Sequence, residues 1–464
     1  MICTAALNFT SCNFLNVEVI GKSDIDSYFA EVSSLEPAMY GVYHETFGLY
    51  DSYMLKYPEV AGDEIVLNST ESNWIQCHNF TLTSSDESTV LAYIWKGAYN
   101  VINNCNEILF YGPKLREAFP EQAAEADRWI AQALFIRALM HFDLCRSYGQ
   151  DFSYTADASH LGVVIMNHIP SLSETIARSS VAEVYSQIIK DLNEAIDTFP
   201  EDYNSSVYFV SPLACKALLA RVYLYMGEWE KARDAASEVI AAVPLVDRSG
   251  YKSMFCTRTP SSDESIFRLN GNLLGHSLYN FYYYENPAAR PSSRVKELMA
   301  EDDIRVSILD YSTTYPDIVM KYSCLDDVTT DEERYYSPIV LRVSEMYLIR
   351  AEALCKLGQN EKAAEDIKAL QSRARGRKTS EISISWSDAA SMEKIIEEER
   401  IRELCFEGHR FFDLARRHQD IIRTSDTQST VTRLEYPDYR YILPIPAVEL
   451  EANKAMQPNP DSND

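Results

Sequence analysis

The segment SPLACKALLARVYLYMGEWEKARDAASEVIAAVP, residues 211 to 244, decides the fold class of this chain. It opens with Ser211, a residue type that caps helix N-termini well, and it places Pro212 at the first helical position. Two helical patterns follow and are separated at Gly227, where a helix can end in a left-handed residue. The segment therefore predicts a helical hairpin.

Small and aromatic residues within this hairpin have the spacing of a tetratricopeptide unit, in which two helices approach each other closely. The residues that carry the pattern are Leu219, Ala220, Tyr223, Ala232 and Pro244. Residues 337–376 repeat the design, with Ser337 and Pro338 at the start and Gly376 after the second helix. We predict a second hairpin there.

Two more helix pairs are expected earlier in the chain. The pair near 122–200 combines the helical patterns at 125–149 and 181–200, and the pair near 24–111 combines those at 24–50 and 88–111. Irregular stretches near 51–87, 150–178 and 245–336 separate the pairs. Long loops inside a compact protein usually carry function, so we expect the binding surface on these insertions.

Composition excludes one class of partner and favours a wet, aromatic surface. The formal charge of −26 repels nucleic-acid phosphates, which bind to clustered basic side chains. Tyrosines outnumber phenylalanines 30 to 18, and a tyrosine hydroxyl needs a hydrogen-bond partner, which favours positions near a wet surface. The alternative is that about half of these rings are ordinary core residues at helix contacts.

The ten cysteines show no spacing suited to a metal site. Five of them fall inside apolar helical patterns and are expected in the core: Cys105, Cys145, Cys215, Cys355 and Cys405. Cys12 differs, because it follows a short apolar segment ending in FTS. Residues 1–12 are similar to a short lipoprotein signal with Cys12 as the lipidated residue, although they lack a basic start; the alternative is an incidental cysteine in a frayed N-terminus.

The segment IIEEERIRELCFEGHRFFDLARR, residues 395–417, resembles the pattern E-R-x-x-E-L-x-F-E-G-x-R-x-x-D-L-x-R of the SusD/RagB family of Bacteroidota nutrient-binding lipoproteins. Residues 342–353 match the family's R-x-x-E-x-x-L-I-x-A-E-A run, and the tail contains L-P-I-P at 443–446. The helical segments at 126–149 and 211–236 are similar to the family as well. Together the resemblance covers most of the chain.

The resemblance implies a mainly α fold: a right-handed tetratricopeptide-like bundle of four helix pairs with long irregular insertions and a few short strands. It implies one domain over 13–464, with a C-terminal family helix at 391–417. It also implies a surface-exposed outer-membrane lipoprotein that partners a SusC-like TonB-dependent transporter. No cofactor is implied.

Glu399, Glu403 and Glu407 recur every four residues and could be mistaken for the paired carboxylates of a glycosidase. Arginines are interleaved with them (Arg400, Arg402, Arg410, Arg416 and Arg417), so we favour a structural ion-pair network. Since the chain contains no recognisable catalytic motif, no catalytic residue or metal ligand is assigned. The acidic run at 326–333 is interpreted as a solvated turn rather than a calcium loop.

The segment LYNFYYYENPAARP, residues 278–291, is our main candidate for ligand contact. If it is a strand, consecutive side chains point to opposite sides and some of the rings must face solvent. The candidates in this segment are Tyr279, Tyr282, Tyr283, Tyr284, Asn286 and Arg290. Trp74, with Asp63 and Asn73 near it, is a second candidate group, in the first insertion. The alternative for the aromatic segment is that its rings cover the flank of the helical bundle.

The function expected from these features is capture of an oligosaccharide without chemistry, for import through the partner channel. Exposed tyrosines and asparagines suit a peptide equally well, so a peptide-binding receptor of the RagB type remains open. A tetratricopeptide scaffold that binds only proteins would need an uninterrupted concave groove, which the long insertions disfavour.

Overall fold

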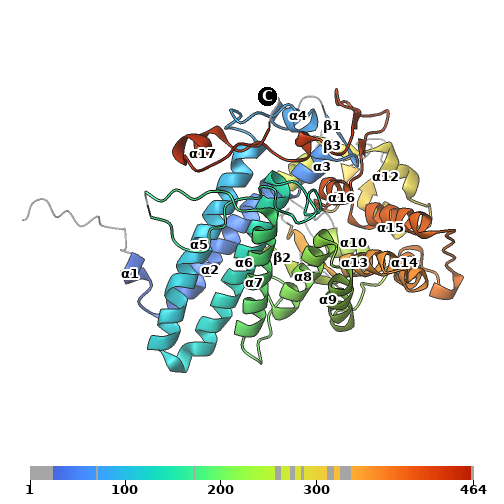
Figure 1. The fold of residues 1–464 in the computed structure, drawn as a ribbon. Coiled ribbons are helices and arrows are strands. Elements are labelled where there is room, and N and C mark those ends of the chain that lie inside the picture. The colour runs from blue at the N-terminus through green and yellow to red at the C-terminus, as the bar shows by residue number, and fades with distance from the viewer. Residues whose placement is uncertain are drawn as a thin grey trace, which may run out of the picture.

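Helices dominate the computed structural model of the chain (Figure 1). The structure describes residues 25–68, 72–171, 173–256, 263–271, 277–283, 287–310, 318–323 and 336–460. The long helices lie side by side, and short helices, strands and loops gather at one end of them (Figure 1). The predicted mainly helical class with a few short strands is confirmed.

The long helices pack in the order in which they occur along the chain. Each helix contacts the next from α5 to α9, α2 packs on α5, and α13 packs on α9, α14 and α15. Their bounds are α2 (Leu35–Leu49), α5 (Val90–Ala118), α6 (Ala123–Tyr148), α7 (Val181–Thr198), α8 (Pro212–Met226), α9 (Trp229–Ala242), α13 (Val343–Lys356), α14 (Asn360–Arg375) and α15 (Ala389–Leu404). A short helix, α1 (Ile25–Tyr28), precedes them.

Local sequence signals set several helix ends. Ser211 Oγ accepts a hydrogen bond from the backbone N–H of Ala214, at 3.2 Å, and Pro212 is the first residue of α8. Gly227 ends α8 with a φ of 72°, and Gly376 ends α14 with a φ of 62°. The predicted cap and stop positions of this hairpin, and the predicted stop at Gly376, are confirmed.

The predicted start of a helix at Ser337 and Pro338 is wrong. Residues Ile339–Arg342 form strand β6, which pairs antiparallel with β2 (Ser265–Arg268), and helix α13 begins only at Val343. A serine followed by proline resembles a helix start, but the hydrogen bonds to β2 hold the backbone extended here. Sequence separation of about 75 residues hides that pairing from any local pattern.

The predicted continuous helix at 391–417 is also a correction, because it is two helices. Helix α15 ends at Leu404 and α16 (Arg410–Arg416) follows, while Phe406 and Gly408 between them have φ values of 67° and 79°. A side chain at Gly408 would bring a Cβ to 3.0 Å from the carbonyl oxygen of Met54. This turn therefore packs closely against the first insertion.

The first and third insertions contain short elements instead of plain loop. The strand β1 (Ile65–Leu67) pairs antiparallel with β3 (Ala289–Pro291), so these two insertions lie together. The other elements are the π-helix at Tyr50–Met54, α3 (Tyr57–Ala61), α4 (Ser72–His78), α10 (Tyr251–Cys256), α11 (Ser277–Tyr282), α12 (Ser293–Leu298), β4 (Leu309–Asp310) and β5 (Ile318–Val319). After α16 come β7 (Ile421–Ile422), β8 (Arg433–Leu434) and α17 (Ala447–Ala452).

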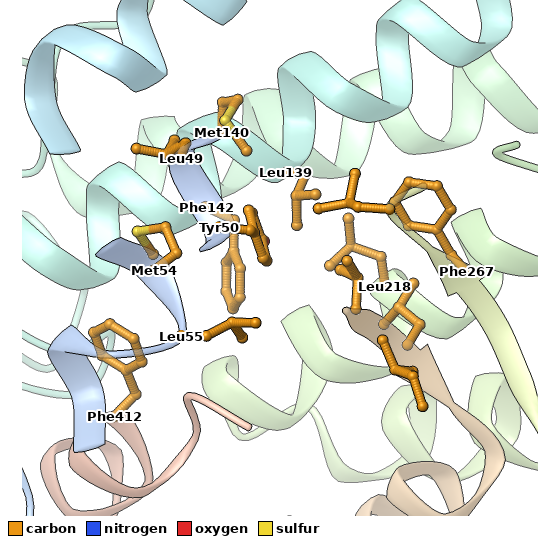
Figure 2. Close-up of a cluster of buried hydrophobic side chains, with 14 of the residues drawn as sticks. Leu49, Tyr50, Met54, Leu55, Leu139, Met140, Phe142, Leu218, Phe267 and Phe412 are labelled. Carbon is orange, nitrogen blue, oxygen red and sulfur yellow. The ribbon is translucent and has the colours of Figure 1, made fainter. Parts of the chain in front are cut away.

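The main core lies where α6 passes between the other long helices. Figure 2 shows side chains from α2, the π-helix, α6 and α8 converging there, with Phe267 of β2 and Phe412 of α16. Each fully buried side chain of this size contributes about 1.5–3 kcal/mol relative to an exposed one. The five cysteines predicted in the core are buried, as expected: Cys105, Cys145, Cys215, Cys355 and Cys405.

Candidate ligand-binding surface

Four aromatic rings form a continuous row across elements far apart in the sequence. Tyr93 of α5 stacks on Tyr53 of the π-helix with 5.2 Å between ring centroids, and Tyr53 lies 6.4 Å from Trp74 of α4. Trp74 lies 5.9 Å from Phe281 of α11. Tyr93 is 45% exposed and Tyr53 is half-buried, whereas the two inner rings are buried. We call these four residues the aromatic row.

Hydrogen bonds to Asp51 hold the inner end of the row in place. The buried carboxylate of Asp51 accepts from the backbone N–H groups of Ser277, at 3.2 Å, and Leu278, at 3.3 Å, and from the hydroxyl of Tyr336. Asp51 thereby joins the π-helix, which carries Tyr53, to α11, which carries Phe281. Single-turn π segments occur often at functional sites.

The segment predicted as an aromatic strand is a short helix, which is a correction. In α11, Tyr279 and Tyr282 are buried, at 5% and 0% exposure, and Tyr282 packs on Tyr322 and Phe406. Tyr283, just after the helix, is half-buried. The alternation argument for exposed rings therefore does not apply to these residues. Tyr284 and Asn286 lie outside the described residues.

The remaining predicted residues have different surroundings. Asp63 is 1% exposed and pairs with Arg410 at 2.7 Å and Arg294 at 3.2 Å. Burial alone would raise the pKa of Asp63, but these guanidinium groups outweigh it and lower the pKa. Asp63 is thus a structural ion-pair partner. Arg290 lies half-buried on β3, and Asn73 lies on α4.

Sequence reasoning missed Tyr53, Tyr93 and Phe281. It named Trp74 and the segment at 278–291 as separate candidates and did not predict the contact between Trp74 and Phe281. Tyr93 has no distinguishing sequence signal, because Phe110 on the same helix is an aromatic residue with similar exposure. Tyr53 carries no local signal, since its role comes from stacking between Tyr93 and Trp74.

The three glutamates that resemble a catalytic set are part of a buried ion-pair network. Glu399 pairs with Arg305 at 2.7 Å and with Arg402 at 3.0 Å, and Glu407 pairs with Arg342 at 2.8 Å. Of the interleaved arginines, Arg402 binds within the set, whereas the other cations come from distant elements. The predicted ion-pair network is present, but apart from Arg402 the partners of Glu399 and Glu407 are not the interleaved arginines that we expected.

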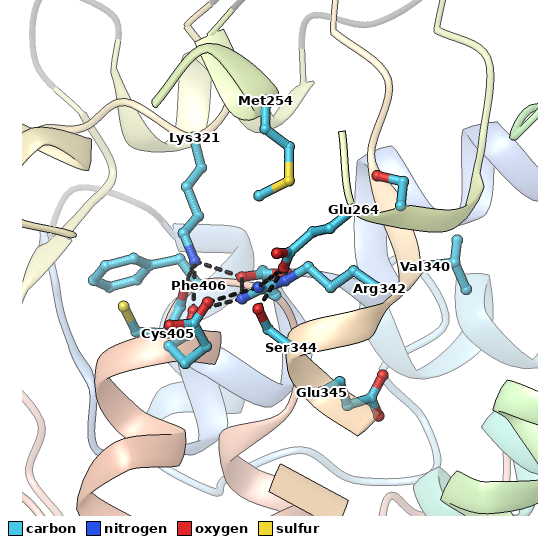
Figure 3. Close-up of polar contacts among 12 residues, drawn as sticks. Met254, Glu264, Lys321, Val340, Arg342, Ser344, Glu345, Cys405 and Phe406 are labelled. Carbon is cyan, nitrogen blue, oxygen red and sulfur yellow. Dashed lines mark hydrogen bonds and ion pairs between the residues drawn. The ribbon is translucent and has the colours of Figure 1, made fainter. Parts of the chain in front are cut away.

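Figure 3 shows the centre of this network, where Lys321 and Arg342 converge. Lys321 donates to the carbonyl oxygen of Cys405 at 2.8 Å and contacts Glu407 at 2.5 Å. Arg342 pairs with Glu264 at 2.8 Å and Glu403 at 2.7 Å. Each of these carboxylates is bound by a cation, so we interpret the network as structural and not as catalytic.

Ser153, His418 and Asp151 lie together at the surface, but their arrangement does not suit nucleophilic catalysis. The Nε2 atom of His418 is 3.0 Å from both Ser153 Oγ and Asp151 Oδ1. A nucleophile–base–carboxylate relay uses the two different ring nitrogens. Tyr436 stacks on His418 at 4.4 Å and donates to Asp151 at 2.6 Å, so the cluster joins the second insertion to the C-terminal segment.

Within the described ranges, no group of three or more His, Cys, Asp or Glu side chains is arranged to hold a metal ion. In the same part of the chain, no helix is both long and apolar enough to cross a bilayer. The acidic run at 326–333 and Cys12 lie outside the described residues.

Two family models match the chain over most of its length. The model described as "SusD family" matches residues 277–461, and the model described as "Starch-binding associating with outer membrane" matches residues 21–224. A SusD-like protein P2 from Formosa agariphila is 26% identical, over 98% of this chain and 97% of its own length.

Solved structures show the same architecture. A SusD superfamily protein from Bacteroides thetaiotaomicron superposes with a TM-score of 0.81 at 24% identity, covering 93% of this chain and 100% of that one. A putative sugar binding protein from Bacteroides vulgatus gives a TM-score of 0.80 at 26% identity, covering 93% and 98%.

This fold and site define a class of protein: a helical bundle whose insertions carry an aromatic surface and are held by buried ion pairs. The chain belongs to the SusD family, as both family models and the relatives indicate.

Proposed function

We propose that this protein captures oligosaccharides at the cell surface through the aromatic row and passes them, without catalysis, to a SusC-like TonB-dependent transporter in the outer membrane. The observation that carries the proposal is the exposed ring of Tyr93 stacked on Tyr53, at one end of a row that reaches Phe281. The row offers a flat apolar face at the surface, backed by buried rings.

The chemistry of the row suits a sugar. The C–H faces of a sugar ring pack against flat aromatic rings, and the ring hydroxyls remain free for polar groups and water. Because Asp51 ties Tyr53 and Phe281 into one unit, the surface is formed before the ligand arrives. A preformed site loses less entropy when it binds.

The comparisons support the carbohydrate class and the location. One matching family model is described as starch-binding and associating with the outer membrane, and one similar structure is titled a putative sugar binding protein. A lipid at Cys12 would anchor the protein, and the transporter partner is part of the proposal. Metabolic labelling with a lipid analogue should mark the protein. Loss of the label in Cys12→Ala would support that anchor, and label that persists in the variant would contradict it.

We propose that the protein does not catalyse a reaction, because its clustered glutamates are bound in the buried ion-pair network. Glu399 is fully buried and is bound by Arg305, Arg402 and Gln371, so it has no free oxygen face for a substrate. A sensitive hydrolysis assay on a mixed glycan panel should find no turnover. Turnover that disappears in Glu399→Gln would overturn this part of the proposal.

The test of binding is calorimetry of the purified protein against arrayed polysaccharides and against a protein hydrolysate. We expect one glycan class to bind, and Tyr93→Ala to weaken that binding about tenfold, or about 1.4 kcal/mol. Phe110→Ala is the matched control, because Phe110 is a 48% exposed ring on the same helix, about 25 Å further along. Binding of peptides alone would refute the carbohydrate class, and equal effects of the two variants would remove the aromatic row from the site.

A further inference from the structure

A concave site lies beside α5. It is an open groove of roughly 400 Å³ between α5, the second insertion and α17. Figure 1 shows α17 and the segment at 150–180 alongside α5. Its polar lining includes Lys96, Asn100 and Asn103 from α5, Glu174 from the insertion and Glu449 from α17. We call it the α5–α17 groove.

Hydrogen bonds from α5 to main-chain carbonyls hold the insertion that forms one wall. The hydroxyl of Tyr99 donates to the carbonyl oxygen of Val164 at 3.0 Å. The side-chain amide of Asn106, which is buried, donates to the carbonyl oxygens of Met166 at 3.1 Å and His168 at 2.9 Å. Because these bonds are internal to the protein, the wall exists without a ligand.

The other wall is held in the same way. Asn453, which follows α17, donates from its side-chain amide to the carbonyl oxygen of Ile176 at 2.7 Å. This bond joins the C-terminal segment directly to the second insertion. A volume of several hundred Å³ between fixed walls is in the range of ordinary small-molecule sites.

The groups that line the groove suit a neutral, hydroxyl-rich ligand. Asn100 and Asn103 each present both a donor and an acceptor, which a sugar hydroxyl can use in either role. One ammonium, from Lys96, faces two carboxylates, from Glu174 and Glu449, so the lining disfavours an anionic ligand. Glu174 is already engaged, because it accepts from the backbone N–H of Ser171 at 3.1 Å and lies 2.8 Å from Nε2 of His168.

The groove continues the line of the aromatic row along one helix face. Tyr93, Lys96, Asn100 and Asn103 occupy positions i, i+3, i+7 and i+10 of α5, which are neighbours on a helix surface. Ten residues of helix span about 15 Å. A chain of several sugar units can therefore reach from the exposed ring of Tyr93 into the groove.

We propose that the α5–α17 groove is a second carbohydrate subsite, which binds the continuation of a glycan chain whose first units pack on the aromatic row. The proposal rests on the proposed function and adds to it a preference for long chains. Short oligosaccharides occupy the aromatic row alone, whereas long ones also make hydrogen bonds to Asn100 and Asn103.

The experiment measures affinity against chain length. The probes are maltooligosaccharides from the disaccharide upward, together with matching size fractions of any other polysaccharide that binds the protein. Asn103→Trp fills the groove with a bulky ring. Asn104→Trp, the neighbouring position whose amide donates to Glu45 of α2 instead, is the matched control.

We expect Asn103→Trp to weaken binding of hexasaccharides and longer chains about tenfold and to leave disaccharide binding within about twofold. The double variant Asn100→Ala, Asn103→Ala adds no bulk and should show the same length dependence with a smaller loss. Melting temperatures close to that of the unmodified protein would exclude misfolding as the cause.

The outcomes separate the two proposals. Long chains that bind both groove variants as tightly as the unmodified protein would overturn the second subsite and leave the aromatic row intact. Loss of all chain lengths in Tyr93→Ala with loss of only long chains in Asn103→Trp would support both. A protein that binds no oligosaccharide of any length would overturn both.

Discussion

Replacing Glu403 by glutamine should destabilise the protein measurably without affecting ligand binding. Glu403 is fully buried and its carboxylate contacts three guanidinium groups: Arg305 at 3.0 Å, Arg342 at 2.7 Å and Arg373 at 2.6 Å. Burial alone would raise the pKa of Glu403, but the three arginines outweigh it and hold the pKa well below its usual range. The ionised form is therefore the native one.

The magnitude follows from the loss of one partner in a buried ion pair. Glutamine keeps one acceptor oxygen but presents an NH₂ group to guanidinium groups that already donate. Breaking a buried pair in this way costs about 3–5 kcal/mol. Unfolding entropy is about 2.1 cal/mol/K per residue, or about 1 kcal/mol/K for 464 residues, so the melting temperature should fall by about 3–5 °C.

Differential scanning calorimetry at neutral pH is the assay, with Glu365→Gln as the control. Glu365 pairs with Lys368 at 2.8 Å, but its side chain is 64% exposed, so its loss should cost no more than about 0.5 kcal/mol. Glycan titration at low temperature should give the same affinity for Glu403→Gln and the unmodified protein. A melting temperature for Glu403→Gln that matches the Glu365→Gln control would refute the assignment of this network as a structural element.

Three further predictions concern contacts that the first insertion makes with the third insertion and with the C-terminal segment. Asp51→Asn replaces one of the two carboxylate oxygens that accept from the N–H groups of Ser277 and Leu278, so it should weaken glycan binding and cost about 1–3 kcal/mol of unfolding free energy, measured by calorimetry and urea titration; unchanged binding would exclude Asp51 from positioning the row. Burial raises the pKa of Glu59 from its ordinary value of 4.5 to about 7. Its stabilising contribution is thus fully present below pH 4.5 and is lost as the pH rises through 7, by on the order of 3 kcal/mol, and Glu59→Gln should remove this dependence in urea titrations between about pH 5 and 8; an unaltered pH profile would contradict it. Gly408→Ala forces a Cβ into a left-handed position near a carbonyl and should lower stability by about 1–3 kcal/mol in urea titrations, whereas Gly48→Ala, with open space around it in α2, should be neutral or stabilising. Equal stabilities of the two glycine variants would contradict the close packing at the turn.

The sequence is sufficient to predict features whose cause is local. The serine cap at Ser211 and the glycine stops at Gly227 and Gly376 depend on the chemistry of a few adjacent residues, and the structure places them as expected. The buried cysteines follow from the same helical periodicity. Such features need no information about distant parts of the chain.

The wrong predictions have distant causes. Strand β6 replaces a helix start because it pairs with β2, and α11 replaces a strand where Asp51 accepts the N–H groups of Ser277 and Leu278 from more than 200 residues away. The break after α15 includes Phe406, a non-glycine residue at a φ of 67°, where no propensity scale favours a left-handed turn. Only the packing of the turn against the first insertion explains it.

Only part of the candidate site could be predicted from the sequence, because its residues meet through contacts between distant segments. Trp74 and the segment around Phe281 were each recognisable as aromatic and inserted, but their contact depends on the pairing of β1 with β3 across more than 200 residues. Tyr53 joins the site because it lies between Tyr93 and Trp74, and a stacking partner has no sequence signature of its own.

The buried ion pairs connect the segment that defines the family to the segments that carry the site. Asp63 of the first insertion pairs with Arg410, Glu59 accepts from the N–H of Gly408, and Lys321 of the third insertion pairs with Glu407. Buried pairs contribute little net stability compared with apolar packing, but a pair that loses one partner is strongly unfavourable, so each fixes its two segments in one relative position. The segments that carry the aromatic row are therefore held by residues that lie outside the proposed site. It follows that exchanging Tyr93 or the lining of the α5–α17 groove can change which ligand binds while the pairs at Arg410 and Glu407 keep the insertions in place.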